Sequence, residues 1–228
     1  MTGPREDVLG AVRDGLVRAV LPGSRDARRW DPRDSGAGTG PEALREAFVQ
    51  ALTALTGHVH SATSAGGAAE VVAAVAAEHG SSSFLSWDDD QLGCPGLLNE
   101  LASRGLTRVT YDLSFDPARR AAEVPALGEA VVGLTGSLAL IADAGAIVLS
   151  SGRGRGRLAS LLPPVHIALA SASRIWPSLP ALFSAEPGLV GQGANLVVIA
   201  GPSRTADIEM TLTHGVHGPK HLHVVLMP

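Results

Sequence analysis

The chain has 228 residues, of which 45% are hydrophobic, and a mean hydropathy of +0.20, a composition that excludes an intrinsically disordered chain. Its formal net charge of −4 and isoelectric point near 6.0 exclude a general attraction to nucleic acid or anionic lipid, so any such binding would be local. No run of about 18 or more apolar residues is present, so we expect no membrane-spanning helix.

The first residues are charged and lack the apolar core of a signal peptide, which predicts a cytoplasmic protein. The single cysteine, Cys94, excludes a disulfide or a four-thiolate iron–sulfur cluster within this chain. No obvious base lies near it in the sequence, so Cys94 is interpreted as an inert thiol rather than a nucleophile.

The N-terminal part predicts one helix followed by a linker. Apolar residues at helical spacing indicate an amphipathic helix over 5–20, ended by a Leu-Pro-Gly sequence. Residues 23–40 are polar, rich in glycine and without periodicity, which is typical of a mobile linker. We therefore predict an extension over 1–40 and a single α/β domain over 41–228.

From residue 41 the sequence alternates between helical and strand patterns. Strands separated by helices of 10 to 15 residues indicate βαβ units and a mainly parallel sheet with helices on both faces. The predicted helices are 41–56, 66–79 and 95–104, and the predicted strands are 58–62, 82–87 and 107–113.

The middle of the domain departs from this alternation. Three apolar segments, 131–136, 138–142 and 146–150, are separated by gaps too short for helices, so we expect them to pair as neighbouring strands in a short antiparallel meander that turns at 143–145. The parallel pattern then resumes. The remaining predicted strands are 165–170, 195–200 and 222–226, and the remaining predicted helices are 177–183 and 205–214.

A polar Gly/Pro turn after the strand 195–200 predicts an anion site. If the turn leads into a helix, the unpaired N–H groups and partial positive charge of that helix would favour a phosphate or carboxylate. The candidate ligand-binding residues are Gly201, Ser203, Arg204 and Thr205. The alternative is that Ser203 or Thr205 only caps the helix.

A second candidate anion-binding loop alternates glycine with arginine. Glycines let a backbone approach a ligand closely, and guanidinium groups bind phosphate, carboxylate or an acidic partner. The loop matches neither a Walker A motif nor a dinucleotide-binding fingerprint, and a solvated turn is an equally good interpretation. Its residues are Gly152, Arg153, Gly154, Arg155, Gly156 and Arg157.

Five residues are candidates for proton transfer. His166 begins a predicted strand and His217 follows the last predicted helix, and histidine exchanges protons near neutral pH. Asp143, Asp207 and Glu209 are the candidate carboxylates. Each has a structural alternative: Asp143 supports a hairpin turn, Asp207 and Glu209 favour a first helical turn, and His166 is packed in the core.

Four histidines near the C-terminus suggest a zinc site, with His221 and His223 on one face of a strand. No Cys, Asp or Glu lies among residues 214–223 to complete a familiar ligand set. We therefore predict no metal site.

Two long segments, 151–167 and 201–226, resemble the glycine-rich turn and the C-terminal signature of the lactate-utilisation (LUD) domain family. With 136–149, the resemblance covers about the C-terminal two fifths of the chain. It implies a fold related to ribose-phosphate isomerases and CoA transferases. Many family members have a Glu-Thr-Gly-Thr-like sequence where this chain has Asp-Ala-Gly-Ala at 143–146, a departure that shortens the carboxylate and removes both hydroxyls.

The resemblance implies a component of an L-lactate or related 2-hydroxy-acid oxidation system. It would bind a small carboxylate or phosphate and pass electrons through cysteine-rich iron–sulfur partner proteins, since this chain binds no such cluster alone. One alternative is a stand-alone isomerase or transferase acting on a sugar phosphate or acyl-CoA, with Asp143 or Asp207 as base. Another is a non-catalytic assembly subunit that holds a partner through residues 1–40. Whether the chain is itself an enzyme stays open.

Overall fold

The computed structural model describes residues 8–10, 12–14, 40–109, 116–128, 130–205, 213–214 and 218–228, with the backbone alone given for residues 122, 124–126, 204, 205, 213 and 214. The chain divides into two units, residues 1–34 and 35–228. In the first unit the described residues 8–10 and 12–14 are helical, within the helix predicted for 5–20. The predicted linker lies almost entirely outside the described residues.

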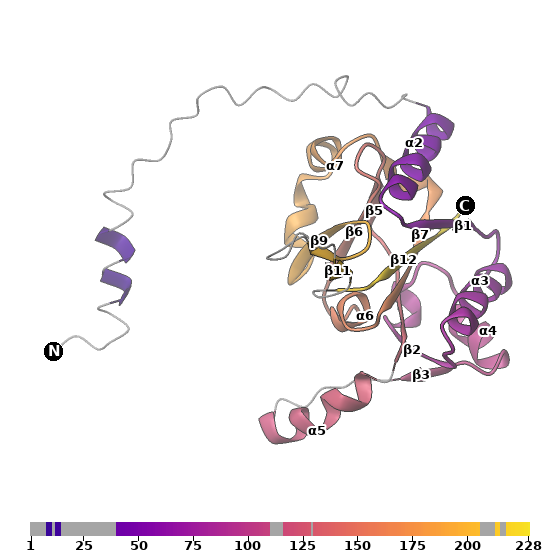
Figure 1. Cartoon of the computed structure of the whole chain (residues 1–228). Coiled ribbons are helices and arrows are strands. Elements are labelled where there is room, and N and C mark those ends of the chain that lie inside the picture. Colours follow the sequence, from indigo (N-terminus) through magenta and orange to yellow (C-terminus); the bar gives the residue numbers. More distant parts are fainter. Residues whose placement is uncertain are drawn as a thin grey trace. The chain divides into compact units, whose positions relative to one another are not determined.

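Six parallel strands form the main sheet of the second unit, in the order β1, β12, β7, β4, β2 and β3 (Figure 1). All four residues of β4 and the first six of β7 are buried, which is typical of central strands covered on both faces. The predicted parallel sheet is confirmed. The strands are β1 (His58–Ser61), β2 (Ser83–Ser86), β3 (Thr107–Val109), β4 (Val132–Thr135), β7 (Val165–Ser171) and β12 (His221–Met227).

Helices cover this sheet, with α3 and α4 together at one side and α6 at another (Figure 1). Glycine at position 133 lets α6 approach, because a Cβ on Gly133 of β4 would overlap the carbonyl oxygen of Ala159. The α-helices are α2 (Pro41–Ala54), α3 (Ala65–Glu78), α4 (Leu97–Ser103), α5 (Pro117–Leu127), α6 (Leu158–Leu161) and α7 (Leu179–Ala185), and the 3₁₀ helices are η2 (Asp89–Gln91), η3 (Ala172–Arg174) and η4 (Pro187–Gly191). Of these, α5, α6 and the 3₁₀ helices were not predicted.

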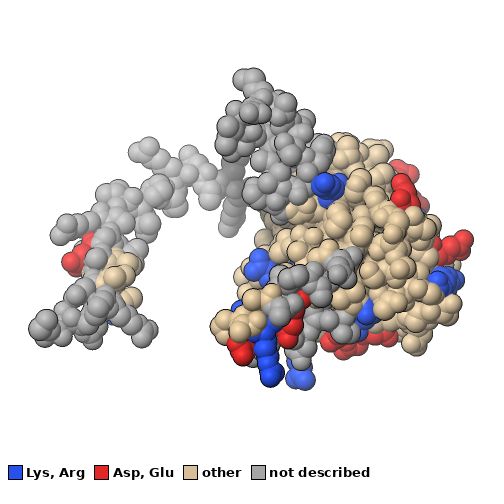
Figure 2. Space-filling view, turned by 60° about the horizontal axis from the view of Figure 1, so that its bottom comes forward, with Lys and Arg blue, Asp and Glu red and all other residues tan. Residues whose placement is uncertain are grey.

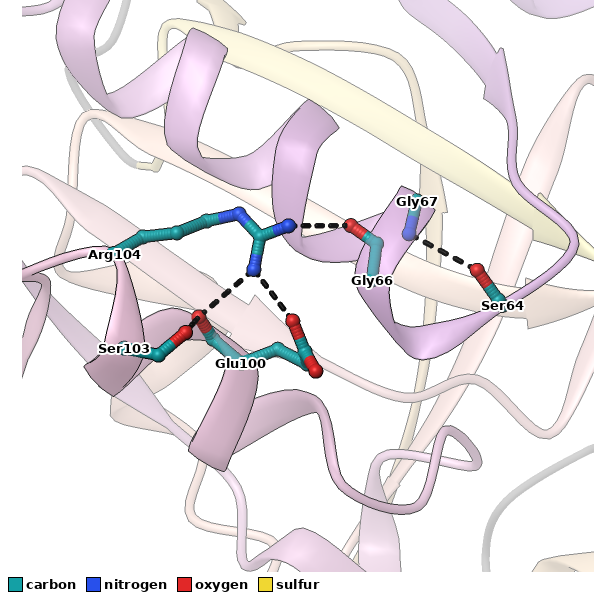
Figure 3. A network of polar contacts seen from close by, with 6 residues as sticks. All are labelled: Ser64, Gly66, Gly67, Glu100, Ser103 and Arg104. Atoms are coloured by element: carbon teal, nitrogen blue, oxygen red, sulfur yellow. Dashed lines mark hydrogen bonds and ion pairs between the residues drawn. The ribbon is translucent and has the colours of Figure 1, made fainter.

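A polar network joins α3 to α4 (Figure 3). Ser64 caps α3 by accepting a hydrogen bond from the Gly67 N–H at 3.1 Å. Arg104 forms an ion pair of 2.6 Å with Glu100, one helical turn earlier, and its Nη2 donates to the Gly66 carbonyl oxygen at 3.3 Å. The guanidinium group therefore ties the end of α4 to the first turn of α3.

Four further strands form a smaller mixed sheet in the order β8 (Ile175–Trp176), β5 (Ala139–Ile141), β6 (Ala146–Ser151) and β9 (Asn195–Ala200). The predicted hairpin is confirmed, since β5 and β6 pair antiparallel around residues 143–145.

Two of the predicted strand pairings are wrong. β4 does not join the meander but lies in the main sheet between β7 and β2, where both of its faces are buried. β9 does not continue the parallel pattern of the main sheet but pairs antiparallel with β6 at the edge of the smaller sheet.

The helix predicted for 205–214 is also wrong at both of its ends. β10 (Arg204–Thr205) pairs antiparallel with β11 (Thr213–His214), which makes these residues parts of a hairpin. Residues 206–212 lie outside the described residues. The β-branched threonines at 205 and 213 favour extended backbone, and this preference outweighs the helix-start signals of the turn.

Among the described residues, no helix is long and apolar enough to cross a membrane.

Candidate functional site

A cavity of about 140 Å³ brings together several of the predicted site residues. It lies beside the first residues of β7 and β12, where α6 meets the turn that follows β9. Its walls combine apolar side chains with two serines and one histidine. The lining residues are Ser160, Leu161, His166, Ile199, Gly201, Pro202, Ser203, Gly218, Pro219 and Leu222.

His166 is a polar residue of the cavity wall, and its surroundings are the following. Its side chain is fully buried, and its Nε2 lies 2.9 Å from the Thr135 hydroxyl oxygen. The other ring nitrogen, Nδ1, is buried without a partner in the described part of the chain. Burial lowers the pKa of His166 to about 3, so the ring is neutral at neutral pH. A neutral imidazole has one donor and one acceptor nitrogen, so the ring is able to hydrogen bond through both.

Strand register explains how the residues around His166 meet. His166 is aligned with Gly133 of β4 on one side and Leu222 of β12 on the other, so the three residues face the same side of the sheet. Because Gly133 leaves room for α6, the helix brings Ser160 to this face. The Ser160 hydroxyl donates to the Arg157 carbonyl oxygen at 3.1 Å.

The turn after β9 forms the opposite wall. Gly201 has a φ of +82°, and a Cβ there would lie 2.9 Å from the Leu55 Cβ, so both backbone conformation and space favour glycine. The Ser203 N–H donates to the Pro219 carbonyl oxygen at 2.9 Å, which ties this turn to the segment before β12. Ser203 is half-buried at the cavity. The predicted helix N-terminus is absent here, since Arg204 and Thr205 belong to β10.

The glycine–arginine loop lies outside this cavity lining. It forms a tight turn in which the N–H groups of Gly152 and Arg155 donate to one another's carbonyl oxygens, at 3.2 and 3.0 Å. Gly154 has a φ of +71° and its carbonyl oxygen accepts from the Asp88 N–H at 2.8 Å. The Trp87 indole donates to the Gly156 carbonyl oxygen at 3.1 Å. The loop is thus fixed against the end of β2.

The three arginines of that loop have different surroundings. Arg155 is half-buried and its Nη2 lies 3.4 Å from the Gln192 carbonyl oxygen, whereas Arg153 and Arg157 are exposed. On the face drawn in Figure 2, described basic side chains lie interspersed among acidic and uncharged residues. The loop offers cations to solvent rather than to the cavity.

Asp143 also lies outside the cavity lining, at the tip of the β5–β6 hairpin. It is exposed, and its N–H donates to the Pro177 carbonyl oxygen at 3.2 Å. Partial loss of hydration raises the pKa of Asp143, while the backbone N–H groups of Ala144 and Asp143 itself oppose the rise. The tip packs on α2, since a Cβ on Gly145 would overlap the Leu52 backbone nitrogen. The remaining predicted catalytic residues, His217, Asp207 and Glu209, lie outside the described residues.

With the fold and cavity described, comparison with known proteins assigns the family. The model of the LUD domain matches residues 45–227, about four fifths of the chain. The chain belongs to the LUD domain family. Every residue that lines the cavity lies within the LUD domain, so the cavity is a feature of that domain rather than of the N-terminal unit.

Similar proteins have been described in several bacteria. Lactate utilization protein C of Geobacillus sp. (strain WCH70) is 32% identical over 186 residues, which cover 77% of this chain and 76% of that protein. The protein of the same name in Macrococcus caseolyticus (strain JCSC5402) is 31% identical over 66% of this chain and 63% of its own length, so the match spans less than two thirds of that relative.

A solved structure supports the fold. The crystal structure of a DUF162 family protein from Deinococcus radiodurans has a TM-score of 0.58 and 22% sequence identity, and it covers 84% of this chain and 100% of its own. The similarity agrees with an α/β fold built on the six-stranded parallel sheet.

A histidine cluster lies on the opposite face of the main sheet from His166. The sequence pointed to His221 and His223 alone among its members, which are His58, His60, His79, His221 and His223. His223 of β12 stacks on His58 of β1, with ring centroids 4.7 Å apart, and its Nδ1 lies 3.0 Å from His60 Nε2. His221 contacts His79, just after α3, at 4.6 Å. Nothing in the sequence spacing links His58, His60 and His79 to the C-terminal pair.

His223, in the middle of the histidine cluster, is neutral at neutral pH. Burial, together with the neighbouring His58, lowers the pKa of His223 to about 3 and lowers that of His60 as well. Within the described residues, no three His, Cys, Asp or Glu side chains are arranged to hold a metal ion. The side chains of His214 and His217, which the zinc interpretation also needs, are not described.

The single cysteine of the domain is buried. Burial, and then the neighbouring Asp89, raises the pKa of the Cys94 thiol. These surroundings favour the protonated, inert form.

Proposed function

We propose that this LUD domain protein is a lactate utilization protein C-like component of an L-lactate, or related 2-hydroxy-acid, oxidation system. The observation that carries the proposal is the 32% identity to lactate utilization protein C of Geobacillus over 77% of the chain. The cavity at His166 supports it, since about 140 Å³ suits a small acid and is below the roughly 300–1,000 Å³ of sites for drug-sized ligands.

Oxidation of a 2-hydroxy acid to the 2-oxo acid releases two electrons and two protons, which need an acceptor. A four-thiolate cluster needs four cysteines, and this chain has one. We propose that cysteine-rich iron–sulfur partner proteins accept the electrons and that this chain binds the small acid. The described geometry does not favour a stand-alone phosphate enzyme, because the helix N-terminus that would hold the phosphate is replaced by the strand β10.

Growth tests the biological part of the proposal. A strain that lacks the gene should fail to grow on L-lactate as sole carbon source, should grow normally on pyruvate, and should recover when the full chain is restored. Unchanged growth on L-lactate would contradict the proposal.

Anaerobic purification of the tagged full chain tests the partners. We expect cysteine-rich proteins to co-purify with it, together with iron and labile sulfide. The matched control is Cys94→Ala, which removes the only thiol of this chain and should leave the iron content of the complex unchanged. A metal-free single chain, or iron that is lost with Cys94, would contradict the arrangement proposed here.

A further inference from the structure

The two ring nitrogens of His166, a residue of the cavity lining, have different surroundings. Nε2 is paired with the Thr135 hydroxyl at 2.9 Å, whereas Nδ1 has no partner in the described part of the chain. The ring is fully buried and lines the cavity together with Ser203. A buried polar nitrogen left unpaired costs about 1–3 kcal/mol, so a ligand that pairs with Nδ1 recovers that cost.

The hydrogen bond to Thr135 determines which ring nitrogen carries the proton. A neutral imidazole has one N–H donor and one acceptor nitrogen. If the Thr135 hydroxyl donates to Nε2, only the Nδ1–H group stays unpaired. If Nε2–H donated instead, both the Thr135 proton and the Nδ1 lone pair would be buried unpaired, since the described residues offer that hydroxyl no second partner. The first arrangement leaves fewer unsatisfied groups, so Nδ1 is a donor.

The charge of the wall restricts the acceptor that Nδ1 takes. The described residues lining the cavity include no Lys, Arg, Asp or Glu, and burial keeps His166 neutral. A carboxylate buried against these described residues would find no counter-charge among them, which is costly. An uncharged hydroxyl or ketone oxygen accepts the Nδ1–H bond without that cost.

We propose that the His166 Nδ1–H group binds the 2-oxygen of a small 2-hydroxy or 2-oxo acid, with the carboxylate turned away from the ring. The choice of acid rests on the proposed function. Thr135 is a positioning residue, because it holds the ring in the tautomer that donates. The cavity then distinguishes a 2-hydroxy or 2-oxo acid from an acid of the same length that lacks the 2-oxygen.

Calorimetric titration of the purified full chain tests this selectivity. The probes are L-lactate, pyruvate and propionate, which share a three-carbon skeleton and a carboxylate, and propionate alone lacks the 2-oxygen. We expect the Kd of propionate to be at least about tenfold higher than that of lactate or pyruvate, the effect of one lost hydrogen bond. Equal affinity for all three acids, or no binding of lactate and pyruvate, would overturn the proposal.

Two substitutions of His166 distinguish the effect of the hydrogen-bond donor from the effect of side-chain volume. In His166→Asn the amide nitrogen takes nearly the place of Nδ1, so the preference over propionate should persist. In His166→Met the volume is kept but the donor is lost, so the preference should fall to about twofold or less. Preference that survives in His166→Met would overturn the assignment.

Nitrogen NMR of the wild-type chain gives a test that needs no variant to fold. With ¹⁵N-labelled histidine, His166 should show a protonated Nδ1 and an unprotonated Nε2 at pH 7, and pyruvate should shift the Nδ1–H signal. A proton on Nε2, or a signal that pyruvate leaves unchanged, would contradict the proposal.

This proposal and the proposed function fail in different ways. Loss of growth on L-lactate together with equal affinity for propionate would reject the role of His166 and keep the function. Unaffected growth together with selective binding and a protonated Nδ1 would keep the role of His166 and reject the function.

Discussion

His166 and His223 lie on adjacent strands, are both buried, and both have a pKa lowered to about 3, yet they belong to different surroundings. His166 is aligned with Leu222 and His223 with Ile167, so the two rings face opposite sides of the sheet. His166 is an isolated ring held by one hydroxyl, and burial alone lowers its pKa. His223 is packed among other imidazoles, and each neighbour adds to the effect of burial.

The comparison shows that the same pKa arises from two arrangements with different consequences. An isolated neutral ring of the cavity lining, with one ring nitrogen unpaired, is able to hydrogen bond to a ligand. A ring stacked on other histidines fills space between β12 and β1, and it resists protonation first because it is buried and then because other imidazoles surround it. Each of the following predictions tests one side of this difference.

Acid should destabilise the protein through both histidines. Their pKa is near 6.5 in the unfolded chain and about 3 in the folded chain, so the unfolded state binds more protons between these values. The stabilisation is complete above pH 6.5 and is lost as the pH falls toward 3. Between pH 6.5 and 5 the free energy of unfolding should fall by about 3 kcal/mol for the two histidines together. Urea unfolding across this range measures it, and a constant free energy would show that neither ring is held neutral.

Gly133→Ala should disrupt the packing of α6 on the side of the main sheet that carries His166, and leave the side that carries His223 unchanged. The added methyl group would overlap the Ala159 carbonyl oxygen and push α6 away from β4, at a cost of about 2–3 kcal/mol. The matched control is Gly66→Ala in α3, where the nearest atom lies 3.8 Å away and alanine favours the helix. Urea unfolding should show a lower free energy of unfolding for Gly133→Ala and no decrease for Gly66→Ala. Similar free energies for the two variants would mean that the packing of α6 does not depend on Gly133.

Thr135→Val should cost about 1–2 kcal/mol, because it keeps the shape of the side chain but leaves His166 Nε2 buried without a partner. The control Thr135→Ser keeps the hydroxyl and loses only a methyl group. In ¹⁵N NMR the valine variant should lose the strict preference for protonated Nδ1, whereas the serine variant should keep it. If Thr135→Val and Thr135→Ser give the same protonation of the two His166 ring nitrogens, the Thr135 hydroxyl does not determine the tautomer.

His58→Gln should change the His223 side only. Without the neighbouring imidazole the pKa of His223 should rise while that of His166 stays the same. The loss of stability between pH 6.5 and 5 should then shrink by less than about 1 kcal/mol. NMR titration of the two rings separates them, and an equal shift in both would show that they are coupled through the sheet.

The smallest effect should come from the α3–α4 ion pair. Glu100→Gln removes one charge of a pair in which both side chains are more than a third exposed, so we expect a loss below about 0.5 kcal/mol. High salt should reduce even this difference. A loss above 1 kcal/mol in urea unfolding would mean that this polar network contributes much more than exposed pairs usually do.

The sequence predicted the main sheet well because the signal there is local. β7 and β12 are mostly apolar and almost wholly buried, and helical patterns of crossover length separate several of the strands. β4 was predicted in the wrong sheet, because a short gap to the next strand does not determine which strands β4 pairs with. The helix predicted for 205–214 rested on the Gly/Pro turn and the acidic residues that follow it. The apolar and polar residues that alternate from Ile208 to Thr213 are a strand pattern, which that prediction did not use.

The candidate site was predicted in part. His166, Gly201 and Ser203 meet at one cavity, whereas Asp143 and the glycine–arginine loop lie elsewhere. Their separation depends on which sheet each strand joins, and spacing along the chain does not carry that information. The contact between His60 and His223 joins residues 163 positions apart, so only the parallel pairing of β1 with β12 reveals it.

The position of β12 has a consequence for how the protein is made. This strand follows all other described strands in the chain, yet it lies inside the main sheet between β1 and β7. A ribosome must therefore release almost the whole domain before the sheet can close. Until then β1 and β7 each present an unpaired edge, which leaves the incomplete sheet open to pairing with strands of other chains. Contacts this distant in sequence also predict slow folding.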